Sequence, residues 1–438
     1  MSEMTKLGAR ASAGARTEAV VDLDTILRSV LFLSVFLAAW ISFHPFVDLS
    51  IAPQAVVEGG DLANQIGFST MFLAFAAWTY CHQPARLLVL LRPVLIATVA
   101  WCVISVLASW EPSLAARRLS FALVVMSLSA MVLLLPKTPR QFSDLIAAAA
   151  LIVLVACYLG VLLLPQLSIH HATDFLEPEH DGNWRGVFPH KNDAGATMVL
   201  FIFIGFYVAR VRSLALGGAI VVLAAVFLAF TQSKTAMGVL PMALILSAVI
   251  GRSRKPAFAV SLVVGILFIF NLCSIGTVLF EPVRSLMEAV MPDATFTGRT
   301  EIWQLGLQAV AQRPITGYGY STFWGTPEVV YGFGNTVTWA NAATDAHNAY
   351  LNLAVTIGIP GMLLVVAWVV ILPIVDFCRQ SPDPDASALQ TLFLRVCLYG
   401  VYASCFESSI LQQVGEVWFF FMTSTFGLRY LSMTRAAA

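Results

Sequence analysis

Asp345, His347 and Asn348 form a polar cluster at the edge of a long apolar segment, in the stretch TDAHNAYLNLAVTIGIPG at residues 344 to 361. Histidine is the side chain that general acid–base catalysis uses most often, and a carboxylate beside it can orient its ring. His347 is therefore a candidate general base, and Asp345 is a candidate for the group that orients it. The alternative is structural, with His347 only capping a helix or hydrogen-bonding a loop carbonyl.

The same stretch predicts the elements that hold these side chains. Asp345 has the residue type of an N-cap for a short helix over about 347–356. Gly358 is expected to end that helix, and Pro360 to begin the next apolar segment. A position at the helix N-terminus favours the neutral imidazole of His347, which can accept a proton.

Basic residues in polar loops are a second source of chemistry. Arg185 and Lys191 lie in NWRGVFPHKNDAG, just before an apolar segment for which Asn192 or Asp193 is the expected N-cap. A helix N-terminus with an arginine and a lysine beside it is suited to an anion. Ion pairing with acidic residues of the same loops is the alternative.

Two further basic residues extend this pattern. Lys234, in FTQSKTAMG, lies on a tight turn between two apolar segments, and Arg299 lies on the first turn of a predicted amphipathic helix in FTGRTEIWQLGLQAVAQRP. Three cationic sites that converge on one outward cleft would suit a diphosphate. We expect Thr297 and Thr300 to cap the amphipathic helix and Pro314 to end it. Its buried face should consist of Ile302, Leu305 and Ala309.

Composition assigns these motifs to a membrane protein. Hydrophobic residues make up 58% of the 438 residues, charged residues 11%, and the mean hydropathy is +0.81. Such a chain cannot be a single soluble core. We expect an all-α integral membrane protein with about 12 transmembrane helices, at about 26–45, 64–81, 87–109, 116–136, 142–165, 192–212, 214–232, 234–251, 256–276, 361–377, 388–409 and 413–433.

The orientation follows from basic residues in alternate short loops, which the positive-inside rule assigns to the cytoplasm. The expected arrangement is a cytoplasmic tail at 1–25, membrane helices over 26–276 and 361–433, a large outward loop with short amphipathic helices at 277–360, and a cytoplasmic tail at 434–438. The first apolar segment is expected to be a retained helix rather than a cleaved signal sequence. In a bacterium the outward side is the periplasm, so the cluster at His347 would face it.

The order and spacing of the motifs resemble a known family. WRGVFPHKNDAG, SKTA, GRTEIW, PITGYGYSTF and DAHNAYLNLAVTIGIPGML together resemble the bacterial O-antigen ligase and polymerase superfamily, and GVFPHKN is most similar to exopolysaccharide polymerases of the ExoQ kind. One departure is Lys234, where similar proteins frequently carry an arginine. Lysine keeps the charge but loses the bidentate fork.

The resemblance implies an inverting glycosyltransferase of the inner membrane. Its donor would be an undecaprenyl diphosphate-linked oligosaccharide, its other partners an acceptor glycan and membrane lipid, and a chain-length regulator protein is a further candidate. In this reading Arg185, Lys191, Lys234 and Arg299 bind the diphosphate, and His347 deprotonates the acceptor while Asp345 orients its ring. Trp184, Trp303, Tyr318 and Tyr320 are candidates for stacking on sugar rings, or alternatively belong to the interfacial aromatic belt.

No cofactor is expected, and metal dependence is disfavoured. The Asp-x-Asp pairs Asp22/Asp24 and Asp383/Asp385 fall on the cytoplasmic side. The acidic and histidine-rich stretch at 170–180 is interpreted as a solvated loop rather than a metal site. The seven cysteines show neither CxxC pairing nor metal-ligand spacing, and a neutral chain with little exposed basic surface is not expected to bind nucleic acid.

Two rival functions stay open. A ligase would use the same donor but transfer the glycan to lipid A core or another terminal acceptor. A twelve-span transporter would line a substrate path with its polar residues. Against the transporter, the longest connection follows the ninth apolar segment and faces outward, whereas two-bundle carriers commonly place theirs midway along the chain, on the cytoplasmic side.

Overall fold

The computed structural model describes residues 23–51, 61–175, 177–290, 299–333, 339–379 and 383–433. In these ranges the chain forms helices joined by loops, with no strand beyond an isolated antiparallel bridge between Ile169 and Trp184. The all-α class is therefore confirmed. The expected tail up to residue 22, including Asp22, the tail at 434–438 and the predicted cap Thr297 lie outside the described residues.

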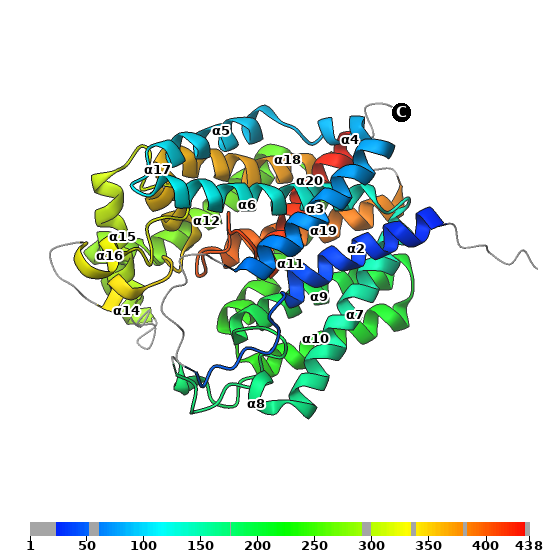
Figure 1. Ribbon diagram of the computed structural model, residues 1–438, viewed down its shortest axis with the longest axis horizontal. Coiled ribbons are helices and arrows are strands. Elements are labelled where there is room, and N and C mark those ends of the chain that lie inside the picture. The colour runs from blue at the N-terminus through cyan, green and yellow to red at the C-terminus, as the bar shows by residue number, and fades with distance from the viewer. Residues whose placement is uncertain are drawn as a thin grey trace, which may run out of the picture.

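Each of the twelve expected segments contains a helix, and short helices lie between some of them (Figure 1). The helices of the first half are α2 Leu23–Ile41, α3 Leu62–His82, α4 Pro84–Leu88, α5 Pro93–Leu107, α6 Pro112–Met131, α7 Pro139–Leu163, α8 Pro165–Ser168, α9 Lys191–Val211 and α10 Leu214–Thr231. Those of the second half are α11 Lys234–Ser253, α12 Pro256–Cys273, α13 Gly276–Leu279, α14 Glu281–Val290, α15 Arg299–Gln312, α16 Pro327–Gly332, α17 Ala349–Val366, α18 Leu372–Phe377, α19 Pro384–Ala403 and α20 Glu416–Met433.

Within the described ranges, nine helical segments are long and apolar enough to cross a membrane. They are α2, α6 with the following turn to Leu134, α7, α9, α10, α11, α12, α17 continued to Phe377, and α19. The helices α3, α5 and α20 fall outside that set, so the number twelve stays a prediction. A multi-pass membrane protein is nevertheless the class that these segments establish.

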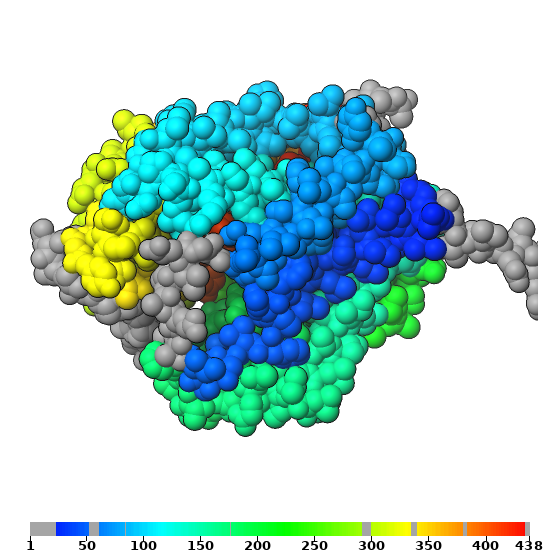
Figure 2. All heavy atoms as spheres, viewed as in Figure 1, coloured from blue at the N-terminus to red at the C-terminus, as the bar shows by residue number. Residues whose placement is uncertain are grey.

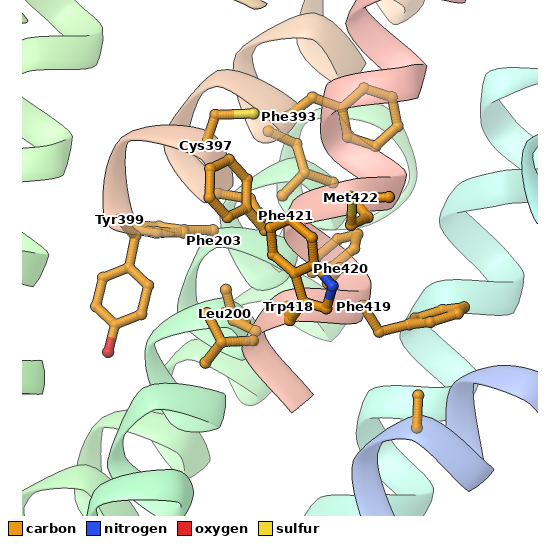
Figure 3. Packing of buried hydrophobic residues seen from close by; sticks show 14 of the residues in the cluster. Leu200, Phe203, Phe393, Cys397, Tyr399, Trp418, Phe419, Phe420, Phe421 and Met422 are labelled. Carbon is orange, nitrogen blue, oxygen red and sulfur yellow. The ribbon is translucent and has the colours of Figure 1, made fainter. Parts of the chain in front are cut away.

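Helices α9, α19 and α20 form the centre of the bundle. In α9 and α19, 72% and 83% of the apolar window is buried inside the protein, against 17% in α12. Figure 3 shows Leu200 and Phe203 of α9 packed with Phe393 and Cys397 of α19 and with the aromatic run from Trp418 of α20. Because these helices are enclosed by others, polar residues at their ends are held in fixed positions.

The large connection between α12 and α17 has a small core of its own. Helices α14, α15 and α16 gather at one end of the molecule (Figure 1). The predicted amphipathic helix is confirmed as α15, whose Ile302, Leu305 and Ala309 are buried with Trp303. This packing fixes the first turn of α15, where Arg299 lies.

The break predicted at Gly358 is confirmed. Its backbone has φ 74° and ψ 170°, a region that is essentially open to glycine alone. A Cβ atom there would lie 1.9 Å from the carbonyl oxygen of Ile315. The N–H of Ile359 donates to the Pro314 carbonyl at 2.8 Å, so the break packs on the segment that follows α15.

The expected boundaries at the last two helices were wrong. Segments at 388–409 and 413–433 left only a three-residue turn, whereas α19 ends at Ala403 and α20 begins at Glu416. The loop 404–415 is thus several residues longer than expected. It contains Glu407, which the expected boundaries had placed inside a membrane helix.

Candidate functional site

A cleft of about 160 Å³ opens among α9, the start of α11 and the loop 404–415. Figure 2 shows the hollowed face, with C-terminal residues in red at its base between the cyan and green parts of the chain. Its polar lining consists of four carboxylates with amides and hydroxyls around them: Asp193, Asp345, Glu407, Glu416, Asn192, Gln412, Ser233, Thr235, Ser408 and Ser409. An uncharged sugar rich in hydroxyl groups fits such a lining better than a bare diphosphate does.

Glu407 is the centre of the polar contacts beside this cleft. Its Oε1 atom accepts a hydrogen bond from Asn192 Nδ2 at 3.2 Å and lies 3.6 Å from Arg299 Nη2. Its Oε2 atom lies 3.6 Å from His347 Nδ1. Arg299 also donates through Nη1 to the carbonyl of Phe406 at 2.8 Å. The structure therefore brings together two of the predicted residues, Arg299 and His347, through a third that the sequence did not single out.

The backbone around His347 is held from several sides. His347 has φ 45°, and its N–H donates to Asp345 Oδ1 at 2.6 Å. Trp303 Nε1 donates to the carbonyl of Ala346 at 3.1 Å. Left-handed backbone at a residue other than glycine persists only where surrounding contacts impose it. His347 is thus positioned by its neighbours rather than by its own preference.

The cap of α17 differs from the expected one. Asn348, not Asp345, is the N-cap, and its Oδ1 accepts from the N–H groups of Tyr350 and Leu351 at 3.0 Å. Asn348 Nδ2 donates to the Cys405 carbonyl at 3.0 Å, which ties α17 to the loop 404–415. Asp345 is instead bonded to the backbone of His347. A buried amide can serve both as cap and as bridge, because it offers a donor and an acceptor.

The carboxylates around His347 act against the helix N-terminus. The Glu407 carboxylate raises the pKa of His347, burial opposes this, and Asp345, with Oδ1 3.9 Å from Nδ1, adds to the rise. They stabilise the protonated ring, whereas the helix N-terminus alone would favour the neutral one. Nδ1 is buried and has no hydrogen-bond partner among the described residues.

Lys234 and Lys191 stand at the first positions of α11 and α9. Lys234 is exposed, and its neighbours Ser233 and Thr235 line the cleft. Ser233 Oγ donates to Asn192 Oδ1 at 3.2 Å, which joins the turn before α11 to the Glu407 contacts. The N-cap of α9 is His190 and not the expected Asn192 or Asp193, because His190 Nδ1 accepts from the Asn192 N–H at 3.1 Å.

Arg185 does not reach the cleft. Its side chain is fully buried, and it donates to the carbonyls of Phe188 at 3.2 Å and Val47 at 2.6 Å. The predicted direct contact with a diphosphate is incompatible with this burial. Arg185 instead fastens the loop before α9 to the segment after α2.

Three of the four candidate sugar-stacking residues are packing residues. Trp303, Tyr318 and Tyr320 are at most 2% exposed, and rings so enclosed cannot stack on a sugar or form an interfacial belt. Trp184 is half-buried and stacked on Phe230 with ring centroids 4.2 Å apart. Tyr320 has a positioning role, since its hydroxyl donates to the carbonyl of Leu411 at 2.6 Å in the loop 404–415.

Glu407 and Glu416 are the site residues that sequence reasoning missed. A usable signal existed, because each is an acidic residue at or inside an apparent membrane segment, where a charge is costly and usually functional. Both line the cleft, whereas the three Asp-x-Asp residues that the structure describes are engaged elsewhere, Asp24 with Arg28 at 2.7 Å. Asp383 caps α19, and Asp385 pairs with Arg140 at 3.1 Å.

The stretch expected as a solvated loop is folded. The N–H of His170 donates to the Asn183 carbonyl at 2.9 Å, and the N–H of Gly182 donates to the His170 carbonyl at 2.9 Å. His170 is buried, with Nδ1 2.8 Å from Asp174 Oδ2. Half of the described residues at 170–180 are exposed, as expected of a solvated loop, but hydrophilic composition alone did not show that polar side chains within it pair with each other.

Comparisons with known proteins support the motif resemblance. The sequence model of the family described as O-Antigen ligase matches residues 219–366, which include Lys234, Arg299, Asp345 and His347. The chain is also 28% identical over 195 residues to the exopolysaccharide production protein ExoQ of Rhizobium meliloti (strain 1021), over 41% of this chain and 43% of that protein. The aligned part thus spans less than half of this relative. With the helical membrane architecture, these matches support the resemblance to the O-antigen ligase and polymerase family, whose sequence model covers residues 219–366 of the chain.

Proposed function

We propose that the chain is an inverting glycosyltransferase that joins undecaprenyl diphosphate-linked oligosaccharide repeats into a polymer at the periplasmic face of the inner membrane. The observation that carries this proposal is the group of Arg299, His347 and Glu407 beside the cleft. Two of the three lie inside the matched family region. Membrane lipid and a chain-length regulator protein are further partners in the proposal, and nucleic acid is not one.

In the proposed reaction an acceptor hydroxyl oxygen attacks C1 of the donor sugar. The bond from C1 to the phosphate oxygen breaks, and the diphosphate leaves with the electron pair. Lys191, Lys234 and Arg299 stand at the helix starts nearest the cleft and would stabilise the leaving charge. Each unit charge within about 4 Å of a phosphate oxygen contributes on the order of 4 kcal/mol at an effective dielectric constant near 20. Side-chain cations therefore replace a metal ion in this step.

The proton of the acceptor hydroxyl passes to His347. A raised pKa makes the neutral imidazole a stronger base, and Glu407 and Asp345 stabilise the imidazolium that forms. The carboxylates and hydroxyls of the cleft would hydrogen-bond the acceptor sugar and present its hydroxyl to the ring. The cations at the rim would hold the donor, and the oxygen atoms within the cleft would hold the acceptor sugar. The two substrates are thereby kept apart before transfer.

A ligase is the second candidate, and the family description O-Antigen ligase favours it. It would use the same donor chemistry and differ only in its acceptor. The name of the ExoQ relative, an exopolysaccharide production protein, favours polymerisation. The transporter is the weakest alternative, because the family match predicts group transfer.

One experiment that varies the acceptor distinguishes a polymerase, a ligase and a transporter. Purified protein in liposomes is incubated with the lipid-linked repeat alone, and products are separated by size. A polymerase yields a ladder in steps of one repeat. A ligase yields new product only after a core oligosaccharide acceptor is added. Neither product, with donor moved across the bilayer, would overturn the proposed transfer.

A further inference from the structure

Glu177, His180 and His190 converge beside the start of α9, outside the polar group around Glu407. One ligand atom of each lies within 4.8 Å of the others, and all three side chains are half-buried. His190 Nε2 is 2.7 Å from Glu177 Oε2, and His180 Nε2 is 3.8 Å from the same oxygen. Two imidazoles with one carboxylate form a donor set that zinc favours, with a fourth position left for water.

His190 Nε2 faces the carboxylate of Glu177. The atom is enclosed by the protein and lies 2.7 Å from Glu177 Oε2, so a metal ion bound here would take the place of the proton between them. The second nitrogen, Nδ1, is engaged by the N–H of Asn192 at 3.1 Å.

The surrounding structure holds the three side chains in place. The ring of His170 lies 5.3 Å from that of His190 and 5.7 Å from that of His180, measured between centroids. Both nitrogens of His170 are engaged, Nδ1 near Asp174 at 2.8 Å and Nε2 with the N–H of Lys191 at 3.3 Å. His170 is therefore a positioning residue and not a ligand.

We propose that Glu177, His180 and His190 bind one Zn²⁺ ion that clamps the loop 177–190 to the first turn of α9. Donor atoms around tetrahedral zinc, with bonds of about 2.0–2.2 Å, lie roughly 3.4 Å apart. On zinc binding, the distance of 2.7 Å between Glu177 Oε2 and His190 Nε2 would lengthen slightly. The distance of 3.8 Å between Glu177 Oε2 and His180 Nε2 would shorten slightly. Both movements are within the reach of side-chain rotation.

Zinc would also affect the cleft indirectly. When Nε2 of His190 binds the ion, the ring proton resides on Nδ1, which can then no longer accept from the Asn192 N–H. Asn192 donates through its side chain to Glu407, so the clamp adjoins the catalytic group without entering it. The ion has a structural role in this arrangement, and the glycosyl-transfer step itself does not pass through it.

The test measures metal content and stability of the purified full chain, carried on a tag without histidines. The protein is stripped with EDTA, dialysed and titrated with Zn²⁺ alone, with Mg²⁺ as the comparison ion. We expect one zinc per chain by elemental analysis and a rise in the thermal unfolding temperature that Mg²⁺ does not produce. Less than a tenth of an equivalent of bound zinc would overturn the proposal.

Matched variants locate the site. His180→Asn and the nearly isosteric Glu177→Gln should each weaken zinc binding at least tenfold, whereas His171→Asn, which alters a histidine outside the cluster, should bind zinc as the unmodified chain does. Equal zinc affinity in Glu177→Gln and the unmodified chain would contradict the assignment. Because these readouts are metal content and unfolding temperature, their failure would leave the proposed glycosyl transfer untouched.

Discussion

Replacing Glu407 by glutamine removes the charge that His347 and Arg299 share while keeping the shape of the side chain. At 3.6 Å the attraction between the carboxylate and the imidazolium is about 5 kcal/mol at an effective dielectric constant of roughly 20. The two side chains are 35% and 30% exposed, so solvent reduces this to about 1–2 kcal/mol. Since 1.36 kcal/mol corresponds to about tenfold in rate, transfer by Glu407→Gln should be about tenfold slower.

The pH profile carries the specific signature of this change. Transfer needs the neutral imidazole, so the initial rate should rise with pH as His347 loses its proton and then reach a plateau. Glu407 raises the pKa of His347, and the glutamine variant should therefore shift the rising limb to lower pH and lower the plateau. Initial rates in liposomes over a pH series measure both effects.

A matched control is Glu328→Gln, which removes an exposed carboxylate from α16 in the large connection. That variant should keep the profile of the unmodified chain. An unchanged plateau and limb in Glu407→Gln, at equal protein level, would refute the role of Glu407. A limb displaced to higher pH would refute the assignment of that limb to His347.

Three further predictions concern topology and stability. Reporter fusions at about residues 180 and 330 should report the periplasm and those at about 138 and 253 the cytoplasm, and a cytoplasmic signal at 330 would remove the proposed site from the donor. Gly358→Ala should destabilise the protein by on the order of 3 kcal/mol, measured as lower thermal stability, because its backbone suits only glycine and the new Cβ would meet the Ile315 carbonyl. Arg185→Ala should lower the unfolding temperature as well as activity, since it leaves two carbonyls without their donor at a cost of about 3 kcal/mol, and an unchanged unfolding temperature would contradict its structural role.

Periodicity and residue type predicted the helices well where one physical cause dominates. The apolar face of α15 and the break at Gly358 follow from patterning and from the backbone freedom of glycine. Caps were less predictable. Asp345, Asn348, Asn192, Asp193 and His190 all have cap-forming side chains, and the choice among them depends on tertiary partners such as the Cys405 carbonyl, to which Asn348 donates.

The site was predictable in its residue types and not in its contacts. Arg299 and His347 were identified from local sequence, but their shared partner Glu407 is far along the chain. Local sequence also could not show that Arg185 and Trp303 point inward, because an arginine and a tryptophan beside an apolar segment are compatible with a binding role or with packing. The burial of both side chains in the structure shows that they pack inside the protein.

The central claim is that Arg299 and His347 carry out glycosyl transfer from a lipid diphosphate. It is tested most directly by mass spectrometry of the lipid-linked glycans in cells whose own copy is replaced by Arg299→Ala or His347→Ala. Both variants should reach normal protein levels, form no polymer and accumulate the undecaprenyl diphosphate-linked single repeat. Arg284→Ala, which removes an arginine paired with Glu281 at 3.1 Å, should still form polymer. Polymer at the unmodified level from either Arg299→Ala or His347→Ala would contradict the account.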